Sequence, residues 1–134
     1  MKLAHLRIGN LIYYNGNKNE LGLITAIESY IIKPKGFVKL NFRNDKTYDL
    51  DQINPIPLTK EWLFNFGFVH DTYGNFSLEL NKDVFLVLYM NEIAKLQQFV
   101  SIAEHTISIK IEFIHQLQNL YFVLTETELT INKQ

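Results

Sequence analysis

The residues from 114 to 125 read IHQLQNLYFVLT, and they carry the clearest helical pattern in a chain of 134 residues. Apolar side chains recur there at the three- and four-residue spacing of one helix face: Leu117, Leu120, Tyr121 and Leu124. Polar side chains take the other side: Gln116, Gln118 and Asn119. The pattern predicts an amphipathic helix that lies against a sheet.

A strand is expected directly before this helix. From Thr106 to Phe113, apolar and polar residues alternate with the period of two that a strand with one wet face requires. Alternation predicts a strand at residues 76–80, and the continuous apolar run at 84–90 predicts a central strand that is buried on both faces. Between them and Thr106, a loop followed by a strand from about Leu96 is favoured over a short helix. Aromatic and β-branched residues are abundant, with ten Phe and seven Tyr, so more sheet than helix is expected.

The first part of the chain predicts a small barrel. Short strand patterns at residues 11–14, 21–27, 37–42 and 47–50 are joined by turn sequences, and Asn15-Gly16 suits a tight hairpin. Several short strands within about fifty residues are typical of an SH3-like β-barrel. We therefore expect an SH3-like subdomain over residues 1–57, ended by the two prolines of Asn54-Pro55-Ile56-Pro57.

A short helix is predicted just after this boundary. Thr59 is a suitable N-cap, Trp62, Leu63 and Phe66 form an apolar face, and Gly67 ends the helix. Residues 58–134 are thus expected to form an antiparallel sheet with one short helix and the C-terminal amphipathic helix. The predicted fold class is α+β, with the barrel and this second part packed together as one compact unit.

Composition excludes several classes of protein. Thirteen basic and fourteen acidic residues give a net charge of −1, so the chain has no global attraction to nucleic acid or anionic membranes. The absence of Cys excludes disulfides, thiolate zinc sites and cysteine nucleophiles. The longest apolar run, Val84–Met90, is too short to span a bilayer, and the first residues lack the apolar core of a secretory signal. We expect a soluble intracellular protein.

Residues that could perform catalysis do not cluster in this sequence. The four His residues are scattered, and Glu112 with His115 lacks the second pair that a carboxylate-bridged metal site needs. Three acids lie close together in the sequence and could hold a hard cation, although turn and surface roles fit them better: Asp45, Asp49 and Asp51. No phosphate loop or nucleophile motif is present. We expect no catalytic residues, no metal and no cofactor.

A local basic segment is the main candidate for binding. Five cations fall within one strand-turn-strand unit: Lys33, Lys35, Lys39, Arg43 and Lys46. Three aromatic residues lie in or beside it and could stack on bases: Tyr30, Phe37 and Tyr48. A positive face that contacts nucleic acid or a partner is one interpretation. The other is ordinary solvated charge around core aromatics.

Three sequence segments resemble a known group. They are RIGNL at residues 7–11, PIPLT at 55–59 with WL at 62–63 and FGF at 66–68, and HQLQNLYF at 115–122. In this order they resemble a group of small proteins of phages, prophages and mobile elements of Bacteroidota, across nearly the whole chain. In that group a Gly is expected after Thr125, where this chain has Glu126. The group has no established activity, so the resemblance carries over no catalytic residues.

The resemblance favours a binding surface over an active site. Small mobile-element proteins without catalytic clusters are often inhibitors of host defence, which is an association from gene context. The expectation is a non-catalytic protein that binds a host or defence macromolecule, most concretely an anti-CRISPR-type inhibitor of a nucleic-acid-guided effector. The alternatives are a direct nucleic-acid-binding accessory protein and, with less support, a metal-dependent hydrolase using the three acids.

Overall fold

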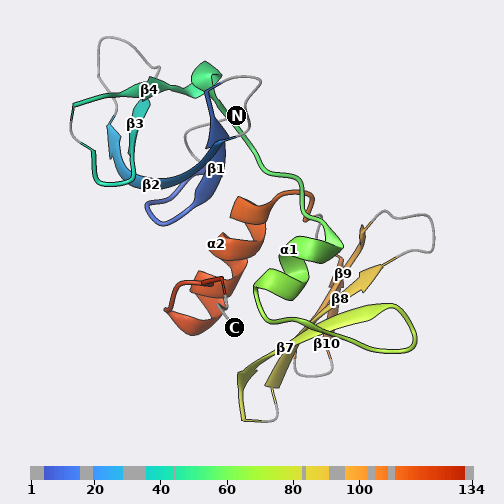
Figure 1. The fold of residues 1–134 in the computed structure, drawn as a ribbon. Helices are drawn as coiled ribbons and strands as arrows, with labels where there is room; N and C mark the ends of the chain where they lie inside the picture. Colours follow the sequence, from blue (N-terminus) through green and yellow to red (C-terminus); the bar gives the residue numbers. More distant parts are fainter. Residues whose placement is uncertain are drawn as a thin grey trace. The chain divides into compact units, whose positions relative to one another are not determined.

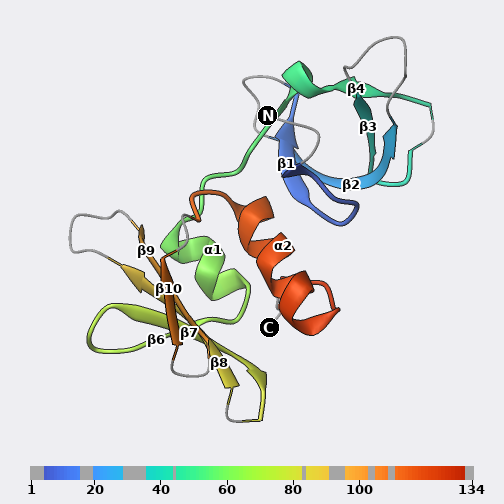
Figure 2. The same ribbon diagram turned by 180° about the vertical axis from the view of Figure 1, so that it is seen from behind.

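The computed structural model describes residues 5–15, 20–28, 36–43, 45–82, 84–90, 96–102, 105–108 and 111–131 (Figures 1 and 2). The chain divides into two compact units. Unit 1 comprises Met1–Pro57 with Phe113–Leu120, and unit 2 comprises Leu58–Glu112 with Tyr121–Gln134. The first segment of unit 1 ends at Pro57, the residue at which the sequence predicted the boundary. Residues 113–120 were expected in the second domain but belong to unit 1. The fold class is α+β with antiparallel sheets.

Unit 1 contains a curled five-stranded sheet (Figure 1). Its strands are β1 (Leu11–Tyr14), β2 (Glu20–Glu28), β3 (Phe37–Leu40), β4 (Tyr48–Asp49) and β5 (Ile53–Asn54), in the order β4-β3-β2-β1-β5. A short 3₁₀ helix, η3 (Leu50–Gln52), connects β4 to β5. Among the described residues these two edge strands do not pair with each other, so the sheet is not a closed barrel.

The core of unit 1 follows the period of two. Strand side chains at alternate positions point inward, and five of them form a buried cluster together with Leu6, which precedes the first strand: Ile12, Ile24, Val38, Leu40 and Ile53. The central position of β2 explains why its sequence is apolar on both faces. A register shift between Ile24 and Ala26 bends this strand, which helps the sheet to curl.

Two predictions in unit 1 were wrong in detail. The strand expected to reach Phe42 ends at Leu40, because Asn41 and Phe42 have φ angles of 56° and 62° and turn the chain. Phe42 is therefore 81% exposed and not in the core. The β1–β2 hairpin forms, and Asn15 has a φ of 62°, but Tyr14 pairs with Glu20, so the connection is longer than a two-residue turn.

The first helix of unit 2 confirms its prediction. Helix α1 spans Lys60–Asn65, and the Thr59 hydroxyl accepts a hydrogen bond of 3.4 Å from the Trp62 amide. Gly67 has a φ of 91°, the left-handed conformation that commonly ends helices. Leu63 is fully buried. Local capping signals were sufficient to place this helix.

The sheet of unit 2 has the order β10-β9-β8-β7-β6. Its strands are β6 (Val69–His70), β7 (Asn75–Asn81), β8 (Val84–Met90), β9 (Leu96–Ile102) and β10 (His105–Ser108). The strand from Leu96 is confirmed. The strand expected from Thr106 to Phe113 is shorter, because Phe113 instead forms a bridge with Pro57, and residues 109 and 110 lie outside the described part. The prediction that β8 is buried on both faces was wrong, since Phe85 is 44% exposed.

Helix α2 spans Ile114–Thr125, as the sequence predicted. Its buried face differs from the expected one. Gln118, assigned to the polar side, is 2% exposed, whereas Leu124, assigned to the apolar side, is 38% exposed. The Gln118 side chain can be buried because its amide oxygen and its amide nitrogen both form hydrogen bonds with backbone groups, as described below. Glu126 follows the helix with a φ of 58°, so it takes the left-handed position where Gly was expected.

Candidate binding pocket

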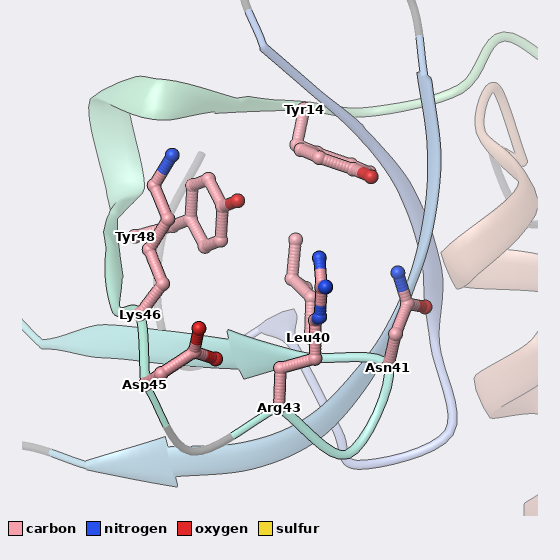
Figure 3. Close-up of a pocket in the computed structure, with 7 residues that line it drawn as sticks. All are labelled: Tyr14, Leu40, Asn41, Arg43, Asp45, Lys46 and Tyr48. Atoms are coloured by element: carbon pink, nitrogen blue, oxygen red, sulfur yellow. The ribbon is translucent and has the colours of Figure 1, made fainter.

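A pocket lies in unit 1, on the side of the sheet where β1, β3 and β4 meet (Figure 3). Seven residues line it: Tyr14, Leu40, Asn41, Arg43, Asp45, Lys46 and Tyr48. Its cavity volume is about 50 Å³. Small-ligand sites have volumes of about 300–1,000 Å³, so this recess does not enclose a whole ligand. It can contact one group of a ligand that lies against its rim.

The turn after β3 builds one wall of the pocket. The Arg43 amide donates a hydrogen bond of 3.0 Å to the Leu40 carbonyl and closes the turn. Two hydrogen bonds hold Asn41 against β2. Its side-chain Oδ1 accepts from the Leu23 backbone amide at 3.0 Å, and its backbone amide donates to the Leu23 carbonyl at 2.9 Å. Asn41 and Arg43 are thus held in fixed positions along the pocket.

Two tyrosines supply the aromatic surface of the pocket. The rings of Tyr14 and Tyr48 meet edge to face, with centroids 5.4 Å apart. Gly22 makes room for this arrangement, since a Cβ atom there would lie 2.9 Å from Cδ1 of Tyr14 and 3.0 Å from Cδ1 of Leu40. The absence of a side chain at Gly22 allows the Tyr14 ring to lie close to the sheet.

Positive charge accompanies these rings. The Arg43 side chain points toward the two tyrosines from the side of Leu40, and Lys46 runs beside Tyr48 (Figure 3). The Lys46 ammonium lies 5.0 Å from the centroid of the Tyr48 ring, within the range of a cation–π contact. Asp45 is the acidic residue of the lining. The pocket thus combines two cations and two aromatic rings with one carboxylate.

The Tyr14 hydroxyl is kept protonated. A hydrogen bond to the Glu20 carboxylate raises the pKa of Tyr14 above its ordinary value of 10.0, and desolvation and the negative charge of Glu20 add to this effect. A phenol in this state donates hydrogen bonds at neutral pH and does not act as a base or nucleophile. Tyr14 therefore contributes its ring to the pocket, because its hydroxyl proton is already donated to Glu20.

The structure describes three of the five predicted basic residues. Arg43 and Lys46 line the pocket together with Tyr48. Lys39 lies on β3 with its ammonium 3.8 Å from the Glu28 carboxylate of β2. Phe37 is half-buried on β3. The remaining predicted residues, Lys33, Lys35 and Tyr30, lie outside the described part of the chain.

Three residues of the pocket were missed by sequence reasoning. Tyr14 comes from β1, and Leu40 and Asn41 come from a segment that was predicted to be a strand. The signal for Asn41 was its residue type, because Asn tolerates a positive φ in turns. Tyr14 had no comparable local signal, since it comes near Tyr48 only through the pairing of β1 with β2, of β2 with β3 and of β3 with β4.

The three acids proposed for a metal do not form a metal site. Asp45 lines the pocket, whereas Asp49 and Asp51 are exposed around η3. The Asp49 amide donates to Oε1 of Gln52 at 2.8 Å, so this residue takes part in the start of the 3₁₀ helix. In the described part of the chain, no three His, Asp or Glu side chains are grouped so that they could hold a metal ion. The hydrolase hypothesis gains no geometric support.

The two terminal segments of the resemblance meet in unit 1. The Gln118 side chain accepts a hydrogen bond of 2.8 Å from the Leu11 amide and donates one of 3.2 Å to the Gly9 carbonyl. Asn119 contacts Asn10, Arg7 and the backbone of the same turn. These residues connect the N-terminal turn to the first half of α2, and their contacts are structural.

Comparisons with protein-family models, with curated proteins and with solved structures return no match. Across the described ranges, none of the helices is both long and apolar enough to pass through a bilayer.

Proposed function

We propose that this chain is a non-catalytic binding protein and that the pocket of unit 1 is its contact with nucleic acid. The observation that supports the proposal is the convergence of Arg43 and Lys46 with the rings of Tyr14 and Tyr48 around one space. Aromatic faces beside cations form the usual binding surface for single strands. The alternation of side chains along the strands does not by itself explain why these two cations and two rings surround one space.

The side chains around the rim of the pocket have the chemistry to contact one unstacked nucleotide. A base can stack on a tyrosine ring, while the guanidinium of Arg43 and the ammonium of Lys46 neutralise the phosphates beside it. Asn41 offers its side-chain NH₂, since its Oδ1 already accepts from Leu23. Asp45 repels phosphate on its own side and so directs the backbone toward the two cations.

We propose a biological role from the resemblance to mobile-element proteins. The chain would act in the host cytoplasm as an anti-CRISPR-type inhibitor and occupy exposed guide RNA on a nucleic-acid-guided effector. The second candidate is a direct nucleic-acid-binding accessory protein, which the pocket favours because it needs no additional partner. We also propose that unit 1 is an SH3-like barrel, supported by its strand order and by the 3₁₀ helix before its last strand.

Binding of a labelled single-stranded oligonucleotide, measured by fluorescence anisotropy at two salt concentrations, tests the proposal. The chain should bind, with an affinity that falls steeply as salt rises, and Tyr48→Ala and Arg43→Gln should each weaken binding. Lys82→Gln is the matched control, because Lys82 is an exposed cation of unit 2. No binding, or equal loss in the control, would contradict the proposal. Co-purification of a nucleoprotein from host lysate that Arg43→Gln abolishes would favour the inhibitor role.

A further inference from the structure

Phe42 occupies an unfavourable position in the turn beside the pocket. Tight hairpin turns with two residues at positive φ prefer Asn followed by Gly, and this turn has Asn41 followed by Phe42, with φ angles of 56° and 62°. A left-handed conformation brings Cβ close to the following carbonyl oxygen, so it destabilises an aromatic residue. Asn41 conforms to the preference, and Phe42 does not.

The exposure of the Phe42 side chain is a second unfavourable feature of this residue. The Phe42 side chain is 81% exposed, so folding gains little from its apolar surface. The backbone is nevertheless held in place, because the Phe42 amide donates a hydrogen bond of 3.0 Å to the Thr25 hydroxyl of β2. Tyr73 in unit 2 is also exposed, at 88%, but its φ is not positive. A strained residue that its surroundings hold in place, with no benefit to folding, is typical of a binding site.

We infer that Phe42 is a second stacking platform, on which the base next to the one in the pocket stacks. This inference rests on the proposed function. Phe42 lies between Asn41 and Arg43 in the sequence, and both of these line the pocket. Phe42 does not itself line the pocket, so its ring is exposed outside it on the same turn as Arg43. The cations Arg43 and Lys46 attract a polyanion to this turn, and this charge complementarity favours a nucleic acid over an apolar protein surface. The ligand class is a single strand of at least two consecutive nucleotides.

The test separates binding from stability. Glycine accepts a positive φ, so Phe42→Gly should leave the melting temperature unchanged or raise it. The same variant should bind fluorescein-labelled oligouridylate about five- to a hundredfold more weakly, the loss that removal of one base–aromatic stack causes. Phe42→Trp should keep the affinity, and Tyr73→Ala, which removes an equally exposed ring in unit 2, should also keep it. Phe42→Asn repeats the test with a second residue that tolerates the turn.

Each contrary outcome has a distinct meaning. If Phe42→Gly binds the probe as tightly as the unsubstituted chain while Tyr48→Ala has lost affinity, the proposed function is supported and the inference about Phe42 is wrong. A large drop in melting temperature for both Phe42→Gly and Phe42→Asn overturns it as well, because Phe42 would then stabilise the fold. Loss of a host protein from pull-downs, with oligonucleotide affinity unchanged, assigns the ring to a protein contact instead. If the unsubstituted chain does not bind the probe at all, the proposed function fails and this inference fails with it.

Discussion

Nδ2 of Asn10 donates a hydrogen bond of 2.8 Å to Oδ1 of Asn119, a residue 109 positions later in the chain. The same oxygen accepts from Nε of Arg7 at 3.2 Å, and the Asn119 amide donates to the His5 carbonyl at 3.0 Å. Asn10 is fully buried. A single amide on α2 thus satisfies several polar groups of the N-terminal turn, and its loss would leave one of them buried without a partner.

Asn119→Ala should lower the free energy of unfolding by about 1–3 kcal/mol, because the Asn10 amide then remains buried and unpaired. Asn10→Ala should have a similar effect, and the double variant should lose less than the sum of the two. Urea denaturation of the four proteins measures this coupling. Asn65→Ala, an exposed asparagine at the end of α1, is the control and should change stability little. Strict additivity of the two substitutions would contradict the network.

Both helices could be located from the sequence because each has a local signal, capping residues for α1 and apolar spacing for α2. Thr59 caps α1 and Gly67 ends it, and both are recognisable without knowledge of any distant residue. The bounds of α2 followed from its apolar spacing in the same way. The position of the chain division after Pro57 also follows from a local property, since proline interrupts strand pairing.

Long-range pairing explains what the sequence could not place. Gln118 looks like a surface residue of an amphipathic helix, and only its bonds to Gly9 and Leu11 make it a buried one. Tyr14 belongs to the pocket through the pairing of four strands, β1 to β4, which no local pattern encodes. Phe42 continued an apolar alternation in the sequence, but the left-handed turn at Asn41 moved it out of the core.

Glu126→Gly should raise the free energy of unfolding by about 1 kcal/mol. Glu126 ends α2 with a φ of 58°, and its amide donates a hydrogen bond of 2.7 Å to the Phe122 carbonyl, so the backbone must keep this conformation. Glycine adopts it without the steric cost that a Cβ atom brings. Glu126→Ala removes the same charge but keeps the Cβ atom, so it should give no such gain. Equal stabilisation by both variants in urea denaturation would assign the effect to charge.

His115→Phe should remove part of the acid sensitivity of the fold. Burial lowers the pKa of His115 below its ordinary value of 6.5, and the positive charge of the nearby His5 lowers it further. The unfolded chain therefore binds a proton at a higher pH than the native chain does. The stability from neutral His115 is complete above about pH 6.5 and is lost as pH falls from there toward the lowered native pKa, by at most about 1.4 kcal/mol per pH unit.

The phenylalanine at position 115 keeps a ring that can stack on Phe113, whose centroid is 5.9 Å from that of His115. Thermal denaturation of both proteins across this pH range measures the difference. The curves should diverge below about pH 6.5. Parallel curves would show that His115 does not account for the pH dependence.

Gly22→Ala should damage the pocket. The added methyl group would lie 2.9 Å from Cδ1 of Tyr14, closer than side chains normally approach, so the Tyr14 ring must move. Overpacking of this kind costs about 1–3 kcal/mol of stability. Oligonucleotide affinity should also fall in the variant at a temperature where circular dichroism shows it to be folded. Unchanged affinity would mean that the position of Tyr14 is not important for binding.

Arg43→Gln and Lys46→Gln should each flatten the salt dependence of oligonucleotide binding. A cation that neutralises one phosphate of a single strand contributes about 0.7 to the slope of log affinity against log salt. Lys39→Gln tests whether the effect belongs to the pocket or to basic residues of this segment in general. Lys39 already lies 3.8 Å from the Glu28 carboxylate, so its removal should leave the slope nearly unchanged. If all three variants flatten the slope equally, the nucleic acid contacts a broad basic face, as the sequence alone suggested, and the pocket is not the specific site.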